Sequence, residues 1–308
     1  MSKDIFREMS WEGLEKFGIT QPVVSPTEEG TEAPVSEVLS IDNYLFFKSF
    51  DCPCCRQPFQ NWYPKEKRIR RESMDLDLRP KYTPIDRSFY EAIICPLCGY
   101  SGMISVFSQL LPYQRDVIKA QVQNQFTAVT YEPEYTVQDA IERFKYALFI
   151  SGVISPNKYG TRAYIAMKLS WFYREIDDLS TSKQFTAMSL EGFKRAMAEE
   201  DPPIMGMSYD TLTYVMARQA MHLDNRDMAL PLLSRVIVSR SAGSQLKNMA
   251  RILKEELVQR QVVDSQVSTA TKPTTKSGTG KPPTQKATAS VQPVVVKKKG
   301  YLLHPKLF

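Results

Sequence analysis

The sequence has few histidines, few glycines and no long apolar run, and each shortage excludes a class of protein. No apolar stretch approaches the roughly 20 residues that a membrane-spanning helix needs. Only 2 histidines, His222 and His304, and 13 glycines occur among 308 residues, and neither a hydrolytic triad nor a glycine-rich phosphate loop is visible. His222 is expected at the end of a helix, where the helix dipole would stabilise a charged ring. We therefore expect a protein that is not an enzyme.

The first residues lack the features of a secretory signal. Charged residues are spread through the first 20 positions, and no apolar core precedes a small-residue cleavage site. The expected compartment is the cytoplasm, where thiols stay reduced. With 308 residues and 43% apolar residues, the chain is long enough to form two units with separate cores.

Positive charge is concentrated at one end of the chain. Residues 262–308 hold eight lysines and one acidic residue, which gives them a net charge of +7. The whole chain carries +6, so residues 1–261 together carry −1. Residues 1–44 carry three basic and nine acidic groups, a net charge of −6. The nearly neutral body is weak evidence for a nucleic-acid-binding surface on the folded part.

All five cysteines fall in two short clusters. Cys52 and Cys55 form a CPxC motif, and Cys95 and Cys98 form a second one that is followed by Gly99. A gap of two residues within a tight turn lets both sulfurs of a pair point at one ion while backbone amides donate to them. Gly99 permits the turn that follows. We predict that these four thiolates bind a structural Zn²⁺ ion, with no open position for water or substrate.

Three other chemistries compete with zinc at these cysteines. Disulfides need an oxidising compartment, a thioredoxin-type CPxC needs a helix starting at the motif within a βαβ pattern, and an iron–sulfur cluster also uses four cysteines. The lack of a secretory signal argues against disulfides, no such βαβ pattern is visible, and the paired spacing fits zinc better than an iron–sulfur cluster. Cys54 is left over, either as a bystander thiol or as an alternative ligand that would make the site sensitive to oxidation.

The segment between the two cysteine pairs contains a basic run. Its candidate nucleic-acid contacts are Lys65, Lys67, Arg68, Arg70 and Arg71. The simpler interpretation is a solvated strand balanced by nearby acids, and binding to phosphate, RNA or DNA is the alternative. The acids Asp75 and Asp77 would share one face of such a strand, as ion-pair partners of neighbouring arginines or, less simply, as metal ligands.

Strand patterns lead into both cysteine pairs, and helical patterns fill the rest of the chain. Residues 44–50 and 89–94 are rich in aromatic and β-branched residues and are expected to form strands. Apolar residues also recur at helical spacing in residues 4–17, before a linker-like stretch at 21–37. From about residue 110 the helical period dominates, and we expect helices at about 112–128, 137–153, 159–177, 183–200, 209–223, 227–240 and 244–261.

The helical half contains an internal repeat. The segment 169–177 aligns with 216–224 at an offset of 47 residues, with aspartate-rich turns at the same place. A second helix follows each turn, and we expect Ala187 and Ala229 to be its small packing residues. This pattern resembles tetratricopeptide repeats, in which helix pairs stack side by side.

The expected fold is α+β and mainly α. It comprises an N-terminal helix and linker in residues 1–40, a zinc-ribbon-like β domain in 41–110, a tetratricopeptide-like helical domain in 111–261 and a disordered tail in 262–308. The tail is rich in Lys, Thr and Pro, a composition that buries too little surface to fold.

The motifs together resemble a known family. They are the two CPxC pairs, the arginines and D-x-D of residues 70–77, the RPxYxP segment of 79–84 and the FYE sequence before the second pair. This set is similar to a bacterial family called domain of unknown function 2225, over about residues 45–257. The resemblance implies a cytoplasmic bacterial protein with a zinc-ribbon-like unit and helical repeats, and it implies no reaction or substrate.

We therefore expect a scaffold or interaction protein whose helical repeats bind a protein or peptide partner. The alternatives are a nucleic-acid-associated factor that uses the basic run and a zinc–thiol redox sensor that uses Cys54. The oligomeric state is left open by the sequence.

Overall fold

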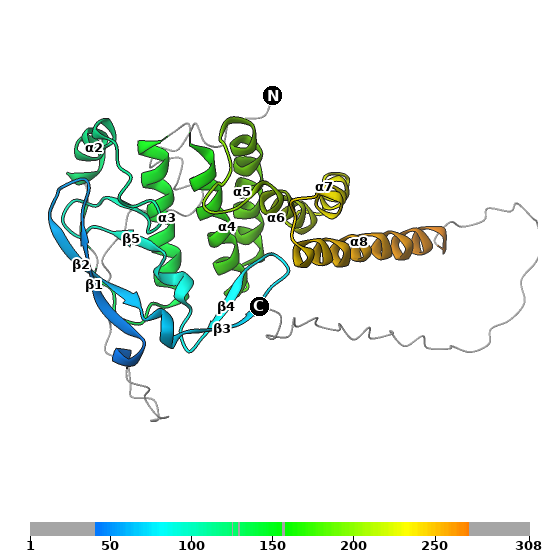
Figure 1. Ribbon diagram of the computed structural model, residues 1–308, viewed down its shortest axis with the longest axis horizontal. Helices are drawn as coiled ribbons and strands as arrows, with labels where there is room; N and C mark the ends of the chain where they lie inside the picture. Colours follow the sequence, from blue (N-terminus) through cyan, green and yellow to red (C-terminus); the bar gives the residue numbers. More distant parts are fainter. Residues whose placement is uncertain (1–40, 125, 129, 156–157, 271–308) are drawn as a thin grey trace, which may run out of the picture.

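The computed structural model describes residues 41–124, 126–128, 130–155 and 158–270 (Figure 1). The helix expected at 4–17, the linker at 21–37 and the part of the tail after Ala270 lie outside these residues. Within them, no helix is long and apolar enough to cross a membrane.

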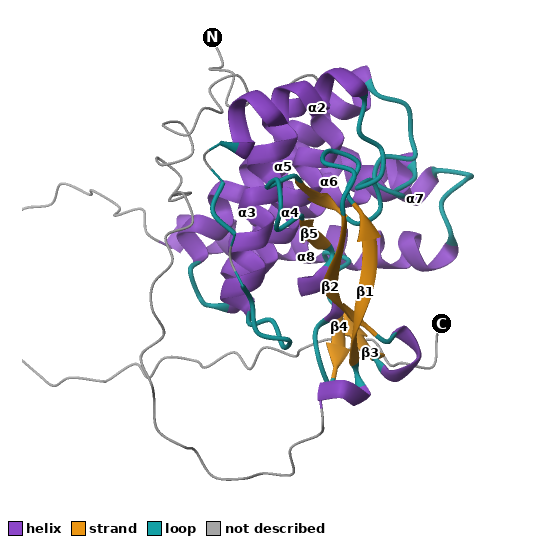
Figure 2. Cartoon of the chain, turned by 90° about the vertical axis from the view of Figure 1, so that its left-hand side faces the viewer, coloured by secondary structure: helices purple, strands orange, loops and turns teal. Residues whose placement is uncertain are grey.

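Three two-stranded antiparallel sheets make up the strand region. They pair β1 (Leu45–Asp51) with β2 (Pro58–Pro64), β3 (Arg70–Met74) with β4 (Pro80–Thr83), and β5 (Ala92–Ile94) with β6 (Ser101–Met103). Short 3-10 turns, η1 (Ile41–Asn43), η2 (Glu66–Arg68) and η3 (Arg87–Tyr90), connect or precede them. Figure 2 shows β1 and β2 as a long hairpin in front of the helices.

The strand expected at 44–50 is confirmed by β1, and the one at 89–94 is correct only in its second half. Phe89 and Tyr90 belong to η3, and β5 begins at Ala92. The cause is local, because the Asp86 carboxylate accepts a hydrogen bond of 2.9 Å from the Ser88 N–H and caps a turn.

The second half of the described chain is helical, as predicted. Its helices are α2 (Pro112–Ile118), which continues into the π-helical segment η4 (Lys119–Gln123), α3 (Val137–Ile154), α4 (Tyr159–Glu175), α5 (Leu179–Glu199), α6 (Tyr209–His222), α7 (Arg226–Val238) and α8 (Ser244–Ala270). Side-chain caps at Thr136, Asp178, Ser208 and Asn225 set four of the starting points. The first helix ends before the expected residue 128, and α8 continues past the expected end at 261.

The internal repeat is visible in the turns that follow α4 and α6. Asp177 and Asp224 both have a φ of 59°. The next residue then caps the following helix, because the Asp178 carboxylate accepts from the Thr181 N–H and the Asn225 side chain accepts from the Met228 N–H. The turns therefore match at the predicted offset of 47 residues.

The small packing residue of the first pair was predicted wrongly. Ala229 is fully buried, as expected, whereas Ala187 is exposed. The turn offset places Ser182 opposite Ala229, and Ser182 is buried with its hydroxyl donating to the Ser170 carbonyl at 2.8 Å. A small polar residue satisfies the same spatial requirement as alanine when its hydroxyl finds a backbone acceptor.

Apolar clusters extend from the strand region into the helices. Leu45 and Tyr90 pack with Phe144 of α3 and Phe172 of α4. The buried cysteines pack with Phe149 of α3. Side chains on both sides of residue 110 therefore stabilise each other.

The β3–β4 hairpin lies against α4 and α6 in the same way. The Tyr214 hydroxyl donates to the Leu76 carbonyl at 2.6 Å, and the Arg79 guanidinium donates to the Trp171 carbonyl at 3.0 Å and pairs with Glu175. Leu76 also packs against the apolar cluster of α4 to α8. The hairpin tip is thus held by helices that lie about a hundred residues further along the chain.

Candidate metal centre

Each cysteine pair sits in a tight turn directly after a strand. Cys52 follows β1 and Cys95 follows β5. In the first turn the Arg56 N–H donates to the Cys52 carbonyl at 2.8 Å, and in the second the Gly99 N–H donates to the Cys95 carbonyl at 3.0 Å. Both donors have a positive φ, 61° at Arg56 and 72° at Gly99. The two turns therefore have the same backbone geometry, which we call the first and second knuckle.

Backbone amides of both knuckles point at the sulfurs. The thiol of Cys55 accepts from the Gln57 N–H, and the thiol of Cys98 accepts from the Tyr100 N–H two residues further on. Such hydrogen bonds stabilise a thiolate over a thiol.

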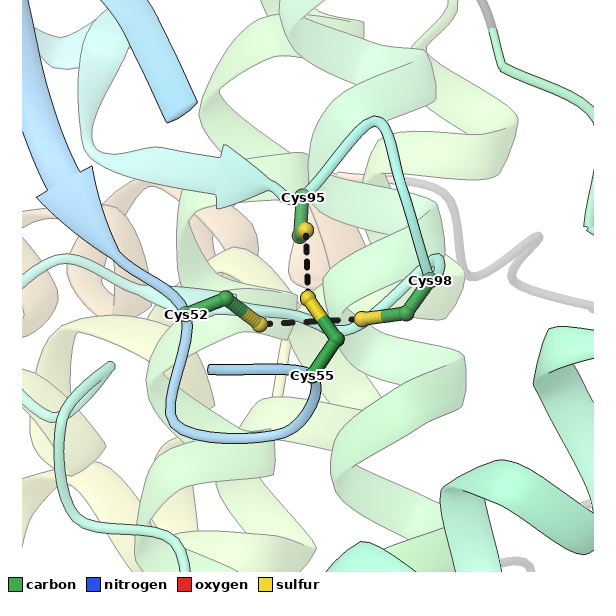
Figure 3. A group of neighbouring side chains, drawn as sticks. All are labelled: Cys52, Cys55, Cys95 and Cys98. Atoms are coloured by element: carbon green, nitrogen blue, oxygen red, sulfur yellow. Dashed lines mark hydrogen bonds between the residues drawn. The ribbon is translucent and has the colours of Figure 1, made fainter. Parts of the chain in front are cut away.

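The four sulfurs of Cys52, Cys55, Cys95 and Cys98 come together, as Figure 3 shows. All four Sγ atoms lie within 4.8 Å of one another. The distance from Cys52 Sγ to Cys98 Sγ is 3.6 Å, and that from Cys55 Sγ to Cys95 Sγ is 3.8 Å. Four sulfurs bound to one ion at about 2.3 Å would be about 3.8 Å apart in a regular tetrahedron. The residues present therefore fit a metal ion bound by four thiolates.

The centre is shielded from water on most sides. Cys52, Cys95 and Cys98 are at most 1% exposed, and Cys55 is partly exposed. A hydrogen bond with Cys95 raises the pKa of the Cys52 thiol to about 12, and burial adds to this effect. A bound cation reverses that preference, because its charge stabilises thiolates at neutral pH.

Cys54 lies beside the centre and is not one of the four clustered sulfurs. Its side chain is only 2% exposed, and burial raises its pKa. A reactive redox thiol is usually accessible and has a lowered pKa, so the position of Cys54 favours a bystander role over the redox-sensor hypothesis.

The basic run begins at Lys65, just before η2, and continues into β3, the strand that pairs with β4. Lys65 donates to the Asp42 carbonyl at 2.6 Å, while the side chains of Lys67, Arg68, Arg70 and Arg71 are exposed. Exposure is compatible with nucleic-acid contact and equally with a solvated surface, so this hypothesis stays untested.

Asp75 and Asp77 lie in the turn between β3 and β4 and do not alternate along a strand as expected. Arg174 of α4 binds both, at 2.6 Å from Asp77 and 3.6 Å from Asp75, and Lys81 lies 3.7 Å from Asp75. Among the described residues, the cysteine cluster is the one group of metal-ligating side chains close enough to hold an ion. The two aspartates therefore fix the hairpin to α4.

One family of known sequences covers most of the chain. A family described as an uncharacterised protein conserved in bacteria, domain of unknown function 2225, matches residues 45–257. The chain belongs to this family. No curated protein and no solved structure gave a match. The matched range begins at β1, contains both knuckles and ends within α8, so the family is defined over the cysteine centre and the helices together.

The four cysteines predicted as ligands are the four that the structure brings together, whereas sequence reasoning missed the role of Arg56. The signal was present, because aligning CPCCR with CPLCG places Arg56 opposite Gly99. Arginine is uncommon at a positive φ, so the propensity of the residue argued against the left-handed turn that the alignment indicated.

Proposed function

We propose that this member of the family is a non-enzymatic interaction protein in which one structural Zn²⁺ ion fixes the strand region and the helices bind a protein or peptide partner. The observation that carries the proposal is the cluster of four buried or half-buried thiols. Four thiolates fill a tetrahedral shell and leave no position for substrate or activating water. The proposed ion therefore stabilises the fold and takes part in no reaction.

The choice of zinc rests on the ligands and their spacing. Thiolate ligands at tetrahedral separation suit zinc and iron, and paired knuckles are typical of structural zinc. Elemental analysis of chain purified without added metal should give one zinc per molecule, and Cys95→Ser should give almost none. Iron with strong visible absorption would contradict the assignment.

The partner-binding part of the proposal rests on the repeated helix pairs. The α4–α5 and α6–α7 pairs share one turn geometry, and stacked helix pairs of this kind present extended surfaces that suit partner segments. The proposed place of action is the cytoplasm.

Affinity capture tests the partner. Tagged full-length chain is incubated with a lysate of the organism that makes it, with and without nuclease, beside a variant in which Lys67, Arg68 and Arg70 are alanine. We expect a protein that survives nuclease and binds both forms. Recovery that requires nucleic acid and the three basic residues, and that weakens steeply with salt, would favour the nucleic-acid alternative, which the exposure of these side chains permits.

A further inference from the structure

An aromatic pair is exposed on the β1–β2 hairpin, which lies in front of the helices in Figure 2. The ring of Phe47 stacks on that of Trp62, its partner in the strand register, with 3.8 Å between the ring centroids and 29° between the planes. Trp62 is half-buried and packs against the apolar cluster shared with α3 and α4, whereas Phe47 is 53% exposed. Phe47 therefore presents a flat apolar surface to solvent, backed by a ring that is itself held by the core.

A concentration of positive charge follows this hairpin directly. β2 ends at Pro64, and residues 65–71 hold five basic residues and one acidic residue, a net charge of +4, although residues 1–261 together carry −1. The near neutrality of the body therefore conceals a local positive patch, and it is the local charge that sets the potential over a surface. Lys67 lies five residues after Trp62, so the charges begin within about 18 Å of the rings.

The patch has basic side chains available for an anion. Three of them, all exposed and without an ion pair to any residue in the described part of the chain, are Lys67, Arg68 and Arg70. Glu66, the acidic residue within the run, is instead paired with Arg87 at 3.2 Å. The Lys65 ammonium donates to the Asp42 carbonyl at 2.6 Å, which holds the start of the run beside the residues that lead into β1. The run and the strand that carries Phe47 therefore belong to one surface.

We propose that this surface binds a single-stranded nucleic acid, an inference that goes beyond the proposed binding of a protein partner by the helices. One base stacks on the exposed face of Phe47 and extends the stack that Trp62 begins. The phosphates that follow along the strand are neutralised by Lys67, Arg68 and Arg70. Stacking on a side chain requires a base that is not already enclosed in a duplex, so the surface selects single strands.

Two other anionic partners are less complementary to this surface. An acidic peptide pairs with the basic side chains, but its carboxylates have no use for the ring of Phe47. An anionic membrane takes up apolar side chains that project into it, whereas the ring of Phe47 lies against Trp62. A single-stranded nucleic acid supplies flat rings and phosphates in one molecule, and it therefore engages both parts of the surface.

Fluorescence anisotropy of labelled oligonucleotides tests the proposal with the full, zinc-loaded chain. The probes are single strands of about 12 nucleotides, one of uridine and one of thymidine, and a DNA duplex of the same length. Hexaglutamate and vesicles that contain phosphatidylserine are the unlabelled competitors. We expect both single strands to bind more tightly than the duplex, and neither competitor to displace them at an equal concentration of charge.

A first set of variants tests the stacking. Phe47→Ala should weaken the single strands about tenfold, since one stacked base contributes about this factor, and should affect the duplex little. Tyr113→Ala is the matched control, because it removes a ring that is 60% exposed on α2, and it should have no effect. Phe47→Leu keeps an apolar side chain without a ring and should weaken binding as Phe47→Ala does, which keeps the test decisive if the alanine variant is unstable.

A second set tests the charge. Replacing all three exposed basic residues by alanine should weaken binding and reduce the slope of log affinity against log salt by about 2, since each phosphate contact to a single strand contributes about 0.7. Equal charge is removed by alanine at three basic residues of α8, which are Lys247, Arg251 and Arg260, and this control should change the slope much less.

The lysines near the C-terminus require a separate control, because residues 262–308 carry +7 and attract any polyanion. Alanine at Lys297, Lys298 and Lys299 should weaken the duplex and the single strands to the same degree. Equal affinity for duplex and single strands, displacement by either competitor, no binding at about 50 mM salt, or full affinity in Phe47→Ala and Phe47→Leu would each overturn the proposal. Thermal unfolding of each variant shows whether a loss comes from misfolding.

The two proposals fail separately. Capture of a protein partner that survives nuclease, by a chain that binds no oligonucleotide, would remove the nucleic-acid surface alone. Oligonucleotide binding by a chain that captures no such protein would leave the nucleic-acid surface standing and remove the interaction function of the helices.

Discussion

The two cysteine knuckles share one backbone and differ in their surroundings. Both end in a residue with positive φ, but this residue is the exposed Arg56 in the first and Gly99 in the second. A Cβ atom at Gly99 would lie 2.5 Å from Cγ of Phe126. Both knuckles therefore contain a left-handed residue at the same position, whereas the neighbouring side chains decide whether that residue must be glycine.

The two knuckles also differ in how deeply their sulfurs are buried. Both sulfurs of the second knuckle are fully buried, and the outer ligand of the first, Cys55, is partly exposed. The second knuckle is the one that contributes two ligands to the core shared with α3. Damage there should reach the helices, and damage to the first knuckle should be tolerated better.

Removing a ligand from the second knuckle should have the largest effect. Cys95→Ser loses a thiolate that is 0% exposed, and structural zinc contributes about 10–16 kcal/mol in small zinc domains, as much as a whole domain's stability. We expect loss of the ion and of the cooperative thermal transition, including most of the helical circular dichroism. Cys55→Ser should also lose the ion but retain more of the transition.

A neighbouring cysteine supplies the control for this experiment. Cys54→Ser changes an equally buried thiol that is not in the cluster, so it should keep the ion and cost about 1–2 kcal/mol for burying a hydroxyl. If Cys54→Ser lost the ion as readily as Cys95→Ser, the assignment of ligands would be wrong.

The pH dependence of zinc binding is the next largest effect. Hydrogen bonds with other cysteines, with burial in addition, raise the pKa of Cys52 to about 12 and also raise that of Cys98. For Cys95, the hydrogen bond from Cys52 lowers the pKa, but that with Cys98 and burial outweigh it and raise it to about 12. At Cys55 burial raises the pKa, and the Gln57 N–H and the neighbouring thiols outweigh it and lower it.

The directions of these pKa shifts determine the sign and the slope of the dependence of zinc affinity on pH. The metal-free site holds protons at neutral pH, and the ion must displace them, so affinity rises with pH and falls in acid. Each thiol that releases a proton on binding lowers the zinc dissociation constant tenfold per pH unit, and Cys52, Cys95 and Cys98 all have raised pKa values, so the constant should drop at least about 1000-fold per pH unit near neutrality. Competition with a chelator of known affinity measures this slope, and a slope near zero would contradict binding through protonated thiols.

Replacing the glycine of the second knuckle tests the steric difference directly. Gly99→Ala places a Cβ at a φ of 72° and against Phe126, which should cost about 3 kcal/mol from backbone strain and overpacking together. Gly102→Ala is the matched control, since its nearest contact would be the Tyr100 hydroxyl at 3.8 Å. Denaturant unfolding of the zinc-loaded chains compares them, and equal costs would show that Phe126 does not restrict the knuckle.

The sequence predicted the helices well because their signals are local. The apolar period and the capping residues Thr136 and Ser208 lie within each helix or next to it. The wrong or missing predictions involve contacts between residues far apart in the sequence, or a capping residue that was overlooked. Phe89 was assigned to a strand although Asp86 starts a turn there, and the docking of Asp77 on Arg174 joins residues 97 positions apart.

The candidate metal centre also has a part that the sequence predicts and a part that it does not. The four ligands were predictable, because metal geometry imposes a fixed spacing within each pair. The left-handed turn at Arg56 was not, because arginine is uncommon at a positive φ and no residue type marks the turn there.

The smallest expected effect is a gain in stability at the first knuckle. Arg56 is exposed and has a φ of 61°, so Arg56→Gly relieves backbone strain without loss of packing. The unfolded chain gains flexibility from glycine, and the net stabilisation should be about 0.5 kcal/mol.

Arg70→Gly, in an exposed strand position of β3, should instead destabilise the chain by about the same amount or more. Opposite signs for these two substitutions would confirm that the first knuckle needs the left-handed conformation and not the arginine side chain. A loss of stability or of zinc in Arg56→Gly would mean that the side chain itself supports the centre, and the two knuckles would then differ in more than their surroundings.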